Sequence, residues 1–160
     1  MKNRPRIKLN ISTTDIIIEI IGWLMLASIW VFTVLNYNDL NEVIPTHYNA
    51  KGEADAFGNK ANIFQLPMVI TILFIGMTIL NRFPHIFNYP VEITAQNAKY
   101  QYENATRLIR MLKLVFVFIF GVIIFETVGN KHFISIWFLP LLFILIFTPI
   151  IYYLIKSSKG

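Results

Sequence analysis

Residues Ile16–Tyr37 read "IIIEIIGWLMLASIWVFTVLNY", an apolar run that contains a single charged residue, Glu19. About 20 helical residues cross the hydrocarbon core of a bilayer, so this run is long enough to span a membrane. Three further apolar runs are of comparable length: Ala61–Leu80, Leu112–Val128 and Phe133–Ile155. The sequence therefore predicts an all-α integral membrane protein, a bundle of four transmembrane helices that forms one domain over residues 1–160.

The composition supports the membrane class and excludes others. Of the 160 residues, 56% are hydrophobic and 14% are charged, whereas soluble domains carry about 25% charged residues. The chain has no cysteine, which excludes disulfides and thiol chemistry, and we expect no cofactor. The net charge is +5, but the basic residues flank apolar runs and form no separate patch between aromatic residues. We therefore expect the lipid bilayer as a partner and no nucleic acid.

Lysine and arginine are distributed unevenly between the segments that flank the apolar runs. Four precede the first run, five lie between Arg82 and Lys113, two lie in residues 38–60, and one, Lys131, lies in the third connection. Positively charged flanks stay on the cytoplasmic side of a membrane. We therefore expect both termini and the connection 81–111 in the cytoplasm and the loop 38–60 outside.

The connection 81–111 has a pattern of its own. Pro84 and Pro90 predict an extended start, and Thr94 is a suitable N-cap for a helix that continues into the third run. Small and apolar residues then recur every three or four positions, at Ala95, Ala98, Tyr102, Ala105, Ile109 and Leu112. Two interpretations remain open. One is an amphipathic helix that packs on its own bundle or on the membrane surface, and the other is a coiled-coil seam that binds a cytoplasmic protein or a second copy of the chain.

The loop between the first two runs is polar and reads "IPTHYNAKGEADAFGNK" from Ile44 to Lys60. Pro45 fixes one backbone angle, and Gly52 and Gly58 permit positive φ angles, which together predict a folded cap. The polar side chains of the loop alternate along the sequence, and an extended chain would place them on one face. They are His47, Asn49, Lys51, Glu53 and Asp55.

Three interpretations of these polar side chains remain open. In the first, they bond to the backbone of the loop and cap the neighbouring helices. In the second, they recognise an extracellular peptide or a lipid headgroup, with Lys60 available for acidic groups. In the third, His47, Glu53 and Asp55 bind a divalent cation. The loop has no serine and the chain has no H-E-x-x-H motif, so we do not expect an enzyme; His47 and Glu53 are the pair suited to acid–base catalysis.

Glu19 lies inside the first apolar run, where an unpaired charge is costly. It is about one turn from the expected cytoplasmic side, within reach of interfacial cations such as Arg82 or Lys113. An ion pair with one of them would offset the cost of burial.

Glu126 lies near the expected outer end of the third run. There it is within reach of Lys131 or His132. It is also on the same expected side as the polar loop, where it can meet His47 or Lys60. In that case Glu126 and the loop form one polar site.

The loop also resembles the signature of a family of bacterial membrane proteins known as domain of unknown function 1648. That signature has an apolar residue, proline, a spacer, histidine, an aromatic residue and asparagine, followed by Gly-Glu-x-Asp, an aromatic residue, glycine, a polar residue and lysine. The matching residues here are Ile44, Pro45, His47, Tyr48, Asn49, Gly52, Glu53, Asp55, Phe57, Gly58, Asn59 and Lys60. The later stretch from Asn88 to Lys113 is similar to the cytoplasmic segment of many such proteins.

The same domain is similar to the N-terminal part of SdpI-type immunity proteins, which protect bacteria from a secreted peptide toxin and, in the best-known case, relay a signal to a repressor. The resemblance implies a non-enzymatic protein of the bacterial cytoplasmic (inner) membrane that acts in toxin immunity or sensing through its outer loop. Two alternatives remain, a metal-binding or hydrolytic membrane enzyme and an assembly subunit that acts through the cytoplasmic helix.

Overall fold

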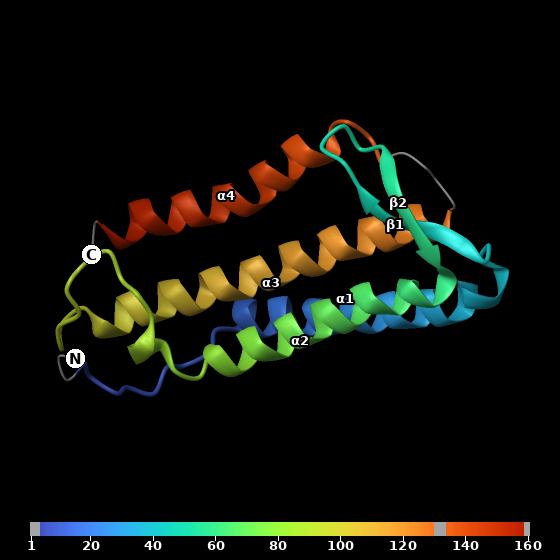
Figure 1. Cartoon of the computed structure of the whole chain (residues 1–160). Coiled ribbons are helices and arrows are strands. Elements are labelled where there is room, and N and C mark those ends of the chain that lie inside the picture. Colours follow the sequence, from blue (N-terminus) through green and yellow to red (C-terminus); the bar gives the residue numbers. More distant parts are fainter. Residues whose placement is uncertain (1–3, 130–133, 159–160) are drawn as a thin grey trace.

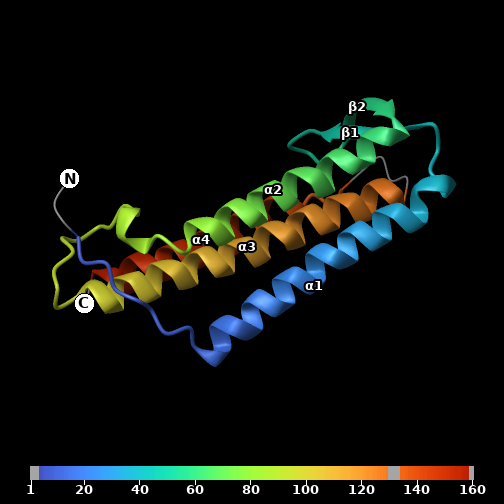
Figure 2. The same cartoon turned by 90° about the horizontal axis from the view of Figure 1, so that it is seen from below.

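The computed structural model describes residues 4–129 and 134–158. In these residues the long helices run along one another with a β-hairpin at one end, which we call the hairpin end (Figures 1 and 2). The N-terminal segment, the connection between the second and third helices, and the end of the fourth helix gather at the opposite end, which we call the termini end (Figure 1). The elements are α1 (Thr13–Asn36), β1 (Val43–Tyr48), β2 (Ala54–Asn59), α2 (Gln65–Leu80), α3 (Ala98–Val128) and α4 (Phe138–Ser157), with 3₁₀ turns at Tyr37–Asp39, Lys60–Phe64 and Pro84–Ile86.

The fold predicted from the apolar runs is confirmed, because four helices within the described part of the chain are long and apolar enough to cross a membrane. With their adjoining turns they cover Thr13–Asp39, Lys60–Leu80, Ala98–Val128 and Phe138–Ser157. α3 has 31 residues, so the predicted amphipathic helix and the third apolar run are one continuous helix. The polar loop forms a two-stranded antiparallel sheet, which adds a small β element to the all-α prediction.

α3 lies at the centre of the bundle and packs against α1, α2 and α4. Val117 of α3 is buried in one core with Leu26 of α1 and Phe74 of α2. α4 packs mainly on α3, and its buried residues are Tyr153 and Ser157. Large hydrophobic side chains are exposed on the outer faces of all four helices. An apolar surface of this extent suggests contact with the lipid bilayer.

The seam predicted on the N-terminal part of α3 is largely covered by the chain itself. Ala98 and Tyr102 are fully buried and Ala105 is nearly so, although Ala95 is exposed. The hydroxyl of Tyr102 donates a hydrogen bond to the carbonyl of Pro5 in the N-terminal segment (3.1 Å). The geometry therefore favours a helix that packs on its own bundle over a seam that binds a separate protein.

Thr94 caps the turn that leads into α3. The backbone N–H of Asn97 donates to Thr94 Oγ1 (3.3 Å), and the N–H of Thr94 donates to Asn97 Oδ1 (2.9 Å). This reciprocal arrangement resembles a capping box, but it closes the turn before the helix. α3 begins at Ala98 with Asn97 as its N-cap and without a side-chain cap, so the predicted N-cap at Thr94 is wrong by three residues.

A charge network links α1 to α3 in the half of the bundle nearer the termini end. It consists of Asp15 and Glu19 of α1 and Arg107, Arg110 and Lys113 of α3. Asp15 lies 3.1 Å from Arg107 Nε, and Glu19 lies 2.7 Å from Lys113 Nζ. Lys113 is 2% exposed and also donates to Thr78 Oγ1 of α2 (2.8 Å). The expected contact between Glu19 and Lys113 is confirmed, and it ties three helices together.

Candidate functional site

The hairpin is fixed to the bundle by its first strand. Ile44 is 2% exposed and packs in the core with Leu40 and Ile63. Pro45 is also buried and lies opposite Phe57, and the register of the strands shifts directly after it. Since proline has no N–H to donate to a ladder, it is tolerated in a strand at such an irregular position. The apolar and proline positions of the signature thus dock the hairpin on the helices.

Asn49 and Gly52 build the turn between the two strands. Asn49 Oδ1 accepts hydrogen bonds from the backbone N–H groups of Lys51 (2.8 Å) and Glu53 (3.1 Å). The backbone of Asn49 donates to the carbonyl of Glu53 and accepts from the N–H of Gly52, both at 2.9 Å. Gly52 has a φ of 84°, a left-handed conformation that residues with a Cβ rarely adopt. The turn between the strands therefore explains why the signature has asparagine and glycine at these two positions.

The signature glycines also allow other segments to approach the hairpin closely. The N–H of Ile134 donates to the carbonyl of Gly52 (2.7 Å), and a Cβ at Gly52 would lie 2.1 Å from the carbonyl oxygen of Ile134. A Cβ at Gly58 would lie 2.5 Å from Asn62 Nδ2 and 3.0 Å from Thr46 Cγ2. The segment that leads into α4 is therefore docked on the hairpin turn, and the segment that leads into α2 is docked on β2.

Charged residues of the loop pair with one another on its exposed side. His47 Nδ1 lies 2.5 Å from Asp55 Oδ1, and these side chains are 65% and 44% exposed. Lys60 Nζ lies 2.9 Å from Glu42 Oε1, with the glutamate side chain 78% exposed. Ion pairs in contact with solvent contribute at most about 1 kcal/mol each. These pairs therefore add little to the stability of the hairpin.

The alternating polar residues do not share one strand face, because the chain reverses direction between β1 and β2. His47 and Asp55 face each other across the two strands, and Asn49 Nδ2 donates to Glu53 Oε2 beside the turn (3.0 Å). In the part of the chain that the structure describes, no three His, Cys, Asp or Glu side chains converge on a position that could hold a metal ion. Of the three candidate cation ligands, His47 and Asp55 thus contact each other, whereas Glu53 contacts Asn49 instead.

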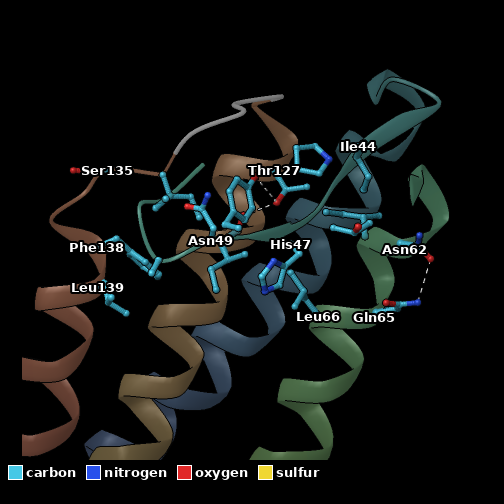
Figure 3. A pocket seen from close by; sticks show the side chains of 18 of the residues that line it. Ile44, His47, Asn49, Asn62, Gln65, Leu66, Thr127, Ser135, Phe138 and Leu139 are labelled. Carbon is cyan, nitrogen blue, oxygen red and sulfur yellow. Dashed lines mark hydrogen bonds between the residues drawn. The ribbon is translucent and has the colours of Figure 1, made fainter. Parts of the chain in front are cut away.

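A pocket of about 300 Å³ lies beneath the hairpin (Figure 3). Its apolar lining comes from β1, the turn before α2, the first turn of α2, α3 and the start of α4. It includes Ile44, Leu66, Ile123, Phe138 and Leu139. Its polar side chains include Thr46, His47, Tyr48, Asn49, Asn62, Gln65 and Thr127. A concave, mainly apolar site with a few polar groups is the usual form of a ligand site. We refer to it as the hairpin pocket.

Tyr48 and Thr127 connect the hairpin to α3 at this pocket. Their hydroxyl oxygens lie 3.4 Å apart. Burial raises the pKa of Tyr48 above its ordinary value, the hydrogen bond with Thr127 lowers it, and the negative charge of Glu126 raises it further. The phenol is therefore neutral at physiological pH and available as a hydrogen-bond donor in the pocket wall.

Glu126 thus approaches the hairpin near this tyrosine. His47 and Lys60, which the sequence suggested as its partners, form ion pairs with acidic residues of the loop instead. The other two suggested partners, Lys131 and His132, lie outside the described residues. Glu126 thus lies close enough to Tyr48 of the loop to affect it electrostatically, and a single polar site that joins Glu126 to the loop stays a prediction.

The sequence did not single out the polar residues that line the hairpin pocket from outside the strands. Asn62 and Gln65 lie at the start of α2, where Gln65 Nε2 donates to Asn62 Oδ1 (3.1 Å), and Thr127 lies in the last turn of α3 (Figure 3). Each is a single polar residue at the end of an apolar run, which resembles an ordinary interfacial residue. Their common location at one expected membrane face is the signal that could have identified them.

Comparison with known proteins supports the resemblance seen in the loop. Residues 24–71, which cover part of α1, the hairpin and the start of α2, match the sequence model of a family described as domain of unknown function (DUF1648). An uncharacterised protein of Archaeoglobus fulgidus is 33% identical over 73 residues, in an alignment that covers 41% of this chain and 40% of the relative. The chain thus matches well under half of the length of that curated relative. No solved structure matches the chain.

Proposed function

We propose that this multi-pass membrane protein is a non-enzymatic receptor for an extracytoplasmic peptide, which it recognises at the hairpin pocket for immunity or sensing. The observation that carries the proposal is the location of the signature. Its asparagine, proline and glycines shape a hairpin that covers the pocket, and its aromatic residue Tyr48 lines the wall. A family signature that serves to build a pocket wall points to recognition at that pocket.

The lining suits an apolar side chain carried by a polar backbone. Leu66, Ile123 and Leu139 offer an apolar floor, while Gln65 and Thr127 offer hydrogen-bond partners for a peptide group. A peptide in this position contacts the hairpin, α2, α3 and the start of α4 at once. α4 packs mainly on α3, and its first turn lines the pocket. A bound peptide can therefore shift α4 and transmit a signal across the membrane.

The recognition surface faces outward in this proposal, and both termini lie in the cytoplasm of a bacterium. The distribution of lysine and arginine supports that orientation. The absence of cysteine allows a direct test with single cysteines at exposed lysines. A Lys51→Cys variant should react in intact cells with a membrane-impermeant maleimide, whereas Lys99→Cys should react only after the membrane is permeabilised. The reverse pattern would contradict the orientation.

The functional test is a challenge of sensitive bacteria with a panel of purified, secreted, membrane-active peptides. Cells that produce the wild-type chain should survive at least one peptide that kills cells with an empty vector. Leu66→Trp fills the hairpin pocket and should abolish this protection. Met68→Trp is the matched control, because Met68 lies on the same helix but is exposed and does not line the pocket.

Two results would count against the proposal. One is equal protection by the Leu66→Trp and Met68→Trp variants when both are present in the membrane in equal amounts. The other is failure of the wild-type chain to protect against every peptide of the panel. Labelling of Lys51→Cys in each variant background shows that the hairpin has still reached its expected side.

A further inference from the structure

A second pocket lies between α3 and α4, in the half of the bundle nearer the termini end. It has a volume of about 550 Å³ and shares no lining residue with the hairpin pocket. On α3 its lining residues follow one helix face from Asn104 to Val115, a length of roughly 16 Å at 1.5 Å per residue. That length is close to one leaflet of the hydrocarbon core, which is about 15 Å thick. We call this pocket the α3–α4 groove.

The polarity of the lining changes along the groove. Arg107 and Lys156 lie at the part nearest the termini end, where α4 finishes, whereas Val115, Ile144 and Leu145 line the part nearer the middle of the bundle. The groove therefore has a cationic end at the depth of a lipid headgroup and an apolar end at the depth of an acyl chain. An amphiphile with an anionic head matches this order.

Asn104 provides an independent sign of a ligand at the cationic end. The residue is 7% exposed and lines the groove. Its Nδ2 is buried and has no hydrogen-bond partner among residues 4–129 and 134–158. Buried amide groups nearly always have partners, because their lost hydration is otherwise not compensated. An acceptor oxygen of a bound molecule would supply the missing partner.

The charges around the cationic end leave one positive charge in excess. The charge network has three cations and two carboxylates. Lys156 adds a fourth cation at the mouth of the groove. Glu103, which is close enough to Arg107 to interact with it electrostatically, adds a third carboxylate. One phosphodiester with a single negative charge would balance this excess.

We propose that the α3–α4 groove binds one anionic phospholipid from the leaflet at the termini end. The phosphate accepts hydrogen bonds from Asn104 Nδ2 and from Lys156, and it lies against the part of Arg107 that does not face Asp15. An acyl chain lies along α3 beside Leu145. The bound lipid fills the groove between α3 and α4 and covers part of α4, which accounts for the limited burial of α4 within the chain.

The test uses the full chain in a mild detergent, with lipid binding followed by native mass spectrometry. The probes are phosphatidylglycerol and phosphatidylcholine with identical acyl chains. We expect one tightly retained phosphatidylglycerol per chain and weaker retention of phosphatidylcholine. Lys156→Gln should weaken phosphatidylglycerol binding about fivefold, the size expected for one basic residue at a lipid headgroup, and leave phosphatidylcholine binding unchanged. Lys99→Gln, an exposed lysine at the same end, is the control and should bind as the wild type does.

Two further variants test the groove itself. Asn104→Leu should weaken phosphatidylglycerol binding, and Leu145→Trp should block both lipids by filling the apolar part. Equal retention of the two lipids by the wild type, or equal binding by Lys156→Gln and Lys99→Gln, would overturn the proposal. Displacement of the bound lipid by millimolar inorganic phosphate would also overturn it, because a free phosphate would then be the ligand. Helical circular dichroism identifies any variant that fails to fold, and Lys156→Gln carries the test in that case.

Discussion

Within the hairpin, most polar side chains bond to groups that are close in sequence, whereas at the termini end charged side chains bond across helices. Asn49 Oδ1 accepts from the N–H groups two and four residues further on, and the ion pair between His47 and Asp55 joins residues eight positions apart. By contrast, 94 positions separate Glu19 from Lys113. The first kind of contact appears in the sequence as a motif, while the second appears only as isolated charges in apolar runs.

The two ends also differ in what their interactions contribute to stability. The hairpin pairs are exposed to solvent, and such pairs contribute at most about 1 kcal/mol each. In the charge network, Asp15, Arg110 and Lys113 are all less than 9% exposed, so removal of one partner leaves an uncompensated charge. The charge network at the termini end should therefore contribute more to the stability of the fold, whereas the interactions at the hairpin end mainly determine the shape of the proposed recognition surface.

Removal of Lys113 should have the largest effect. Lys113→Met keeps most of the side-chain volume but leaves the carboxylate of Glu19 without its closest partner. We expect the free energy of unfolding to fall by about 3–5 kcal/mol, the usual cost of breaking a buried ion pair. Reversible unfolding in mixed micelles, followed by circular dichroism, measures this change.

Two controls sharpen this result. Lys99→Met removes an exposed lysine from the same helix and should change the free energy of unfolding by less than about 0.5 kcal/mol. The double variant Glu19→Gln with Lys113→Met should recover part of the loss, because both charges are then absent. A loss below about 1 kcal/mol for Lys113→Met would place the network among exposed pairs and remove the contrast between the two ends.

Substitution of Gly52 should have an intermediate effect. Gly52→Ala introduces a Cβ at a φ of 84° and at 2.1 Å from the carbonyl oxygen of Ile134. We expect a loss of about 1–3 kcal/mol and faster amide exchange at Ile134, whose N–H donates to Gly52. Gly76→Ala is the matched control, because a Cβ there meets no atom within 4 Å, and it should be neutral or stabilising by up to about 1 kcal/mol.

Gly52→Asn separates the two reasons for glycine at this position. Asparagine adopts positive φ angles more readily than alanine does, but its Cβ meets the same carbonyl oxygen. We therefore expect Gly52→Asn to be about as destabilising as Gly52→Ala. Full stability of the asparagine variant would show that the φ angle alone requires glycine and that the segment before α4 can move away from the turn.

The four helices could be predicted from the sequence because the length of an apolar run is a local property. The folded cap was also predictable, since proline fixes a backbone angle and glycine permits the positive φ angles that tight turns need. The strand pairing was harder to predict, because the polar alternation of residues 47–55 is equally consistent with one extended strand. The turn at Asn49, made by side chain-to-backbone bonds, decides between the two arrangements.

The hairpin pocket and the α3–α4 groove could not be predicted in the same way. Both are lined by residues of different elements, and their form depends on how α4 packs against α3. The partner of Glu19 was more predictable, because its depth in the apolar run left few cations within reach, and one of the two suggested, Lys113, is its partner in the structure. For Glu126 the same reasoning gave four possible partners, because several cations lie at its depth, and depth alone did not distinguish between them.

The ion pair between His47 and Asp55 should have the smallest effect, and it tests the comparison from the hairpin side. A double-mutant cycle with His47→Ala and Asp55→Ala should give a coupling energy below about 1 kcal/mol, because both side chains are largely exposed. Added salt should reduce the coupling further. A coupling above about 2 kcal/mol would mean that the pair is shielded from water by something outside the chain. The exposed face of the hairpin, and not only the pocket beneath it, would then belong to the recognition surface.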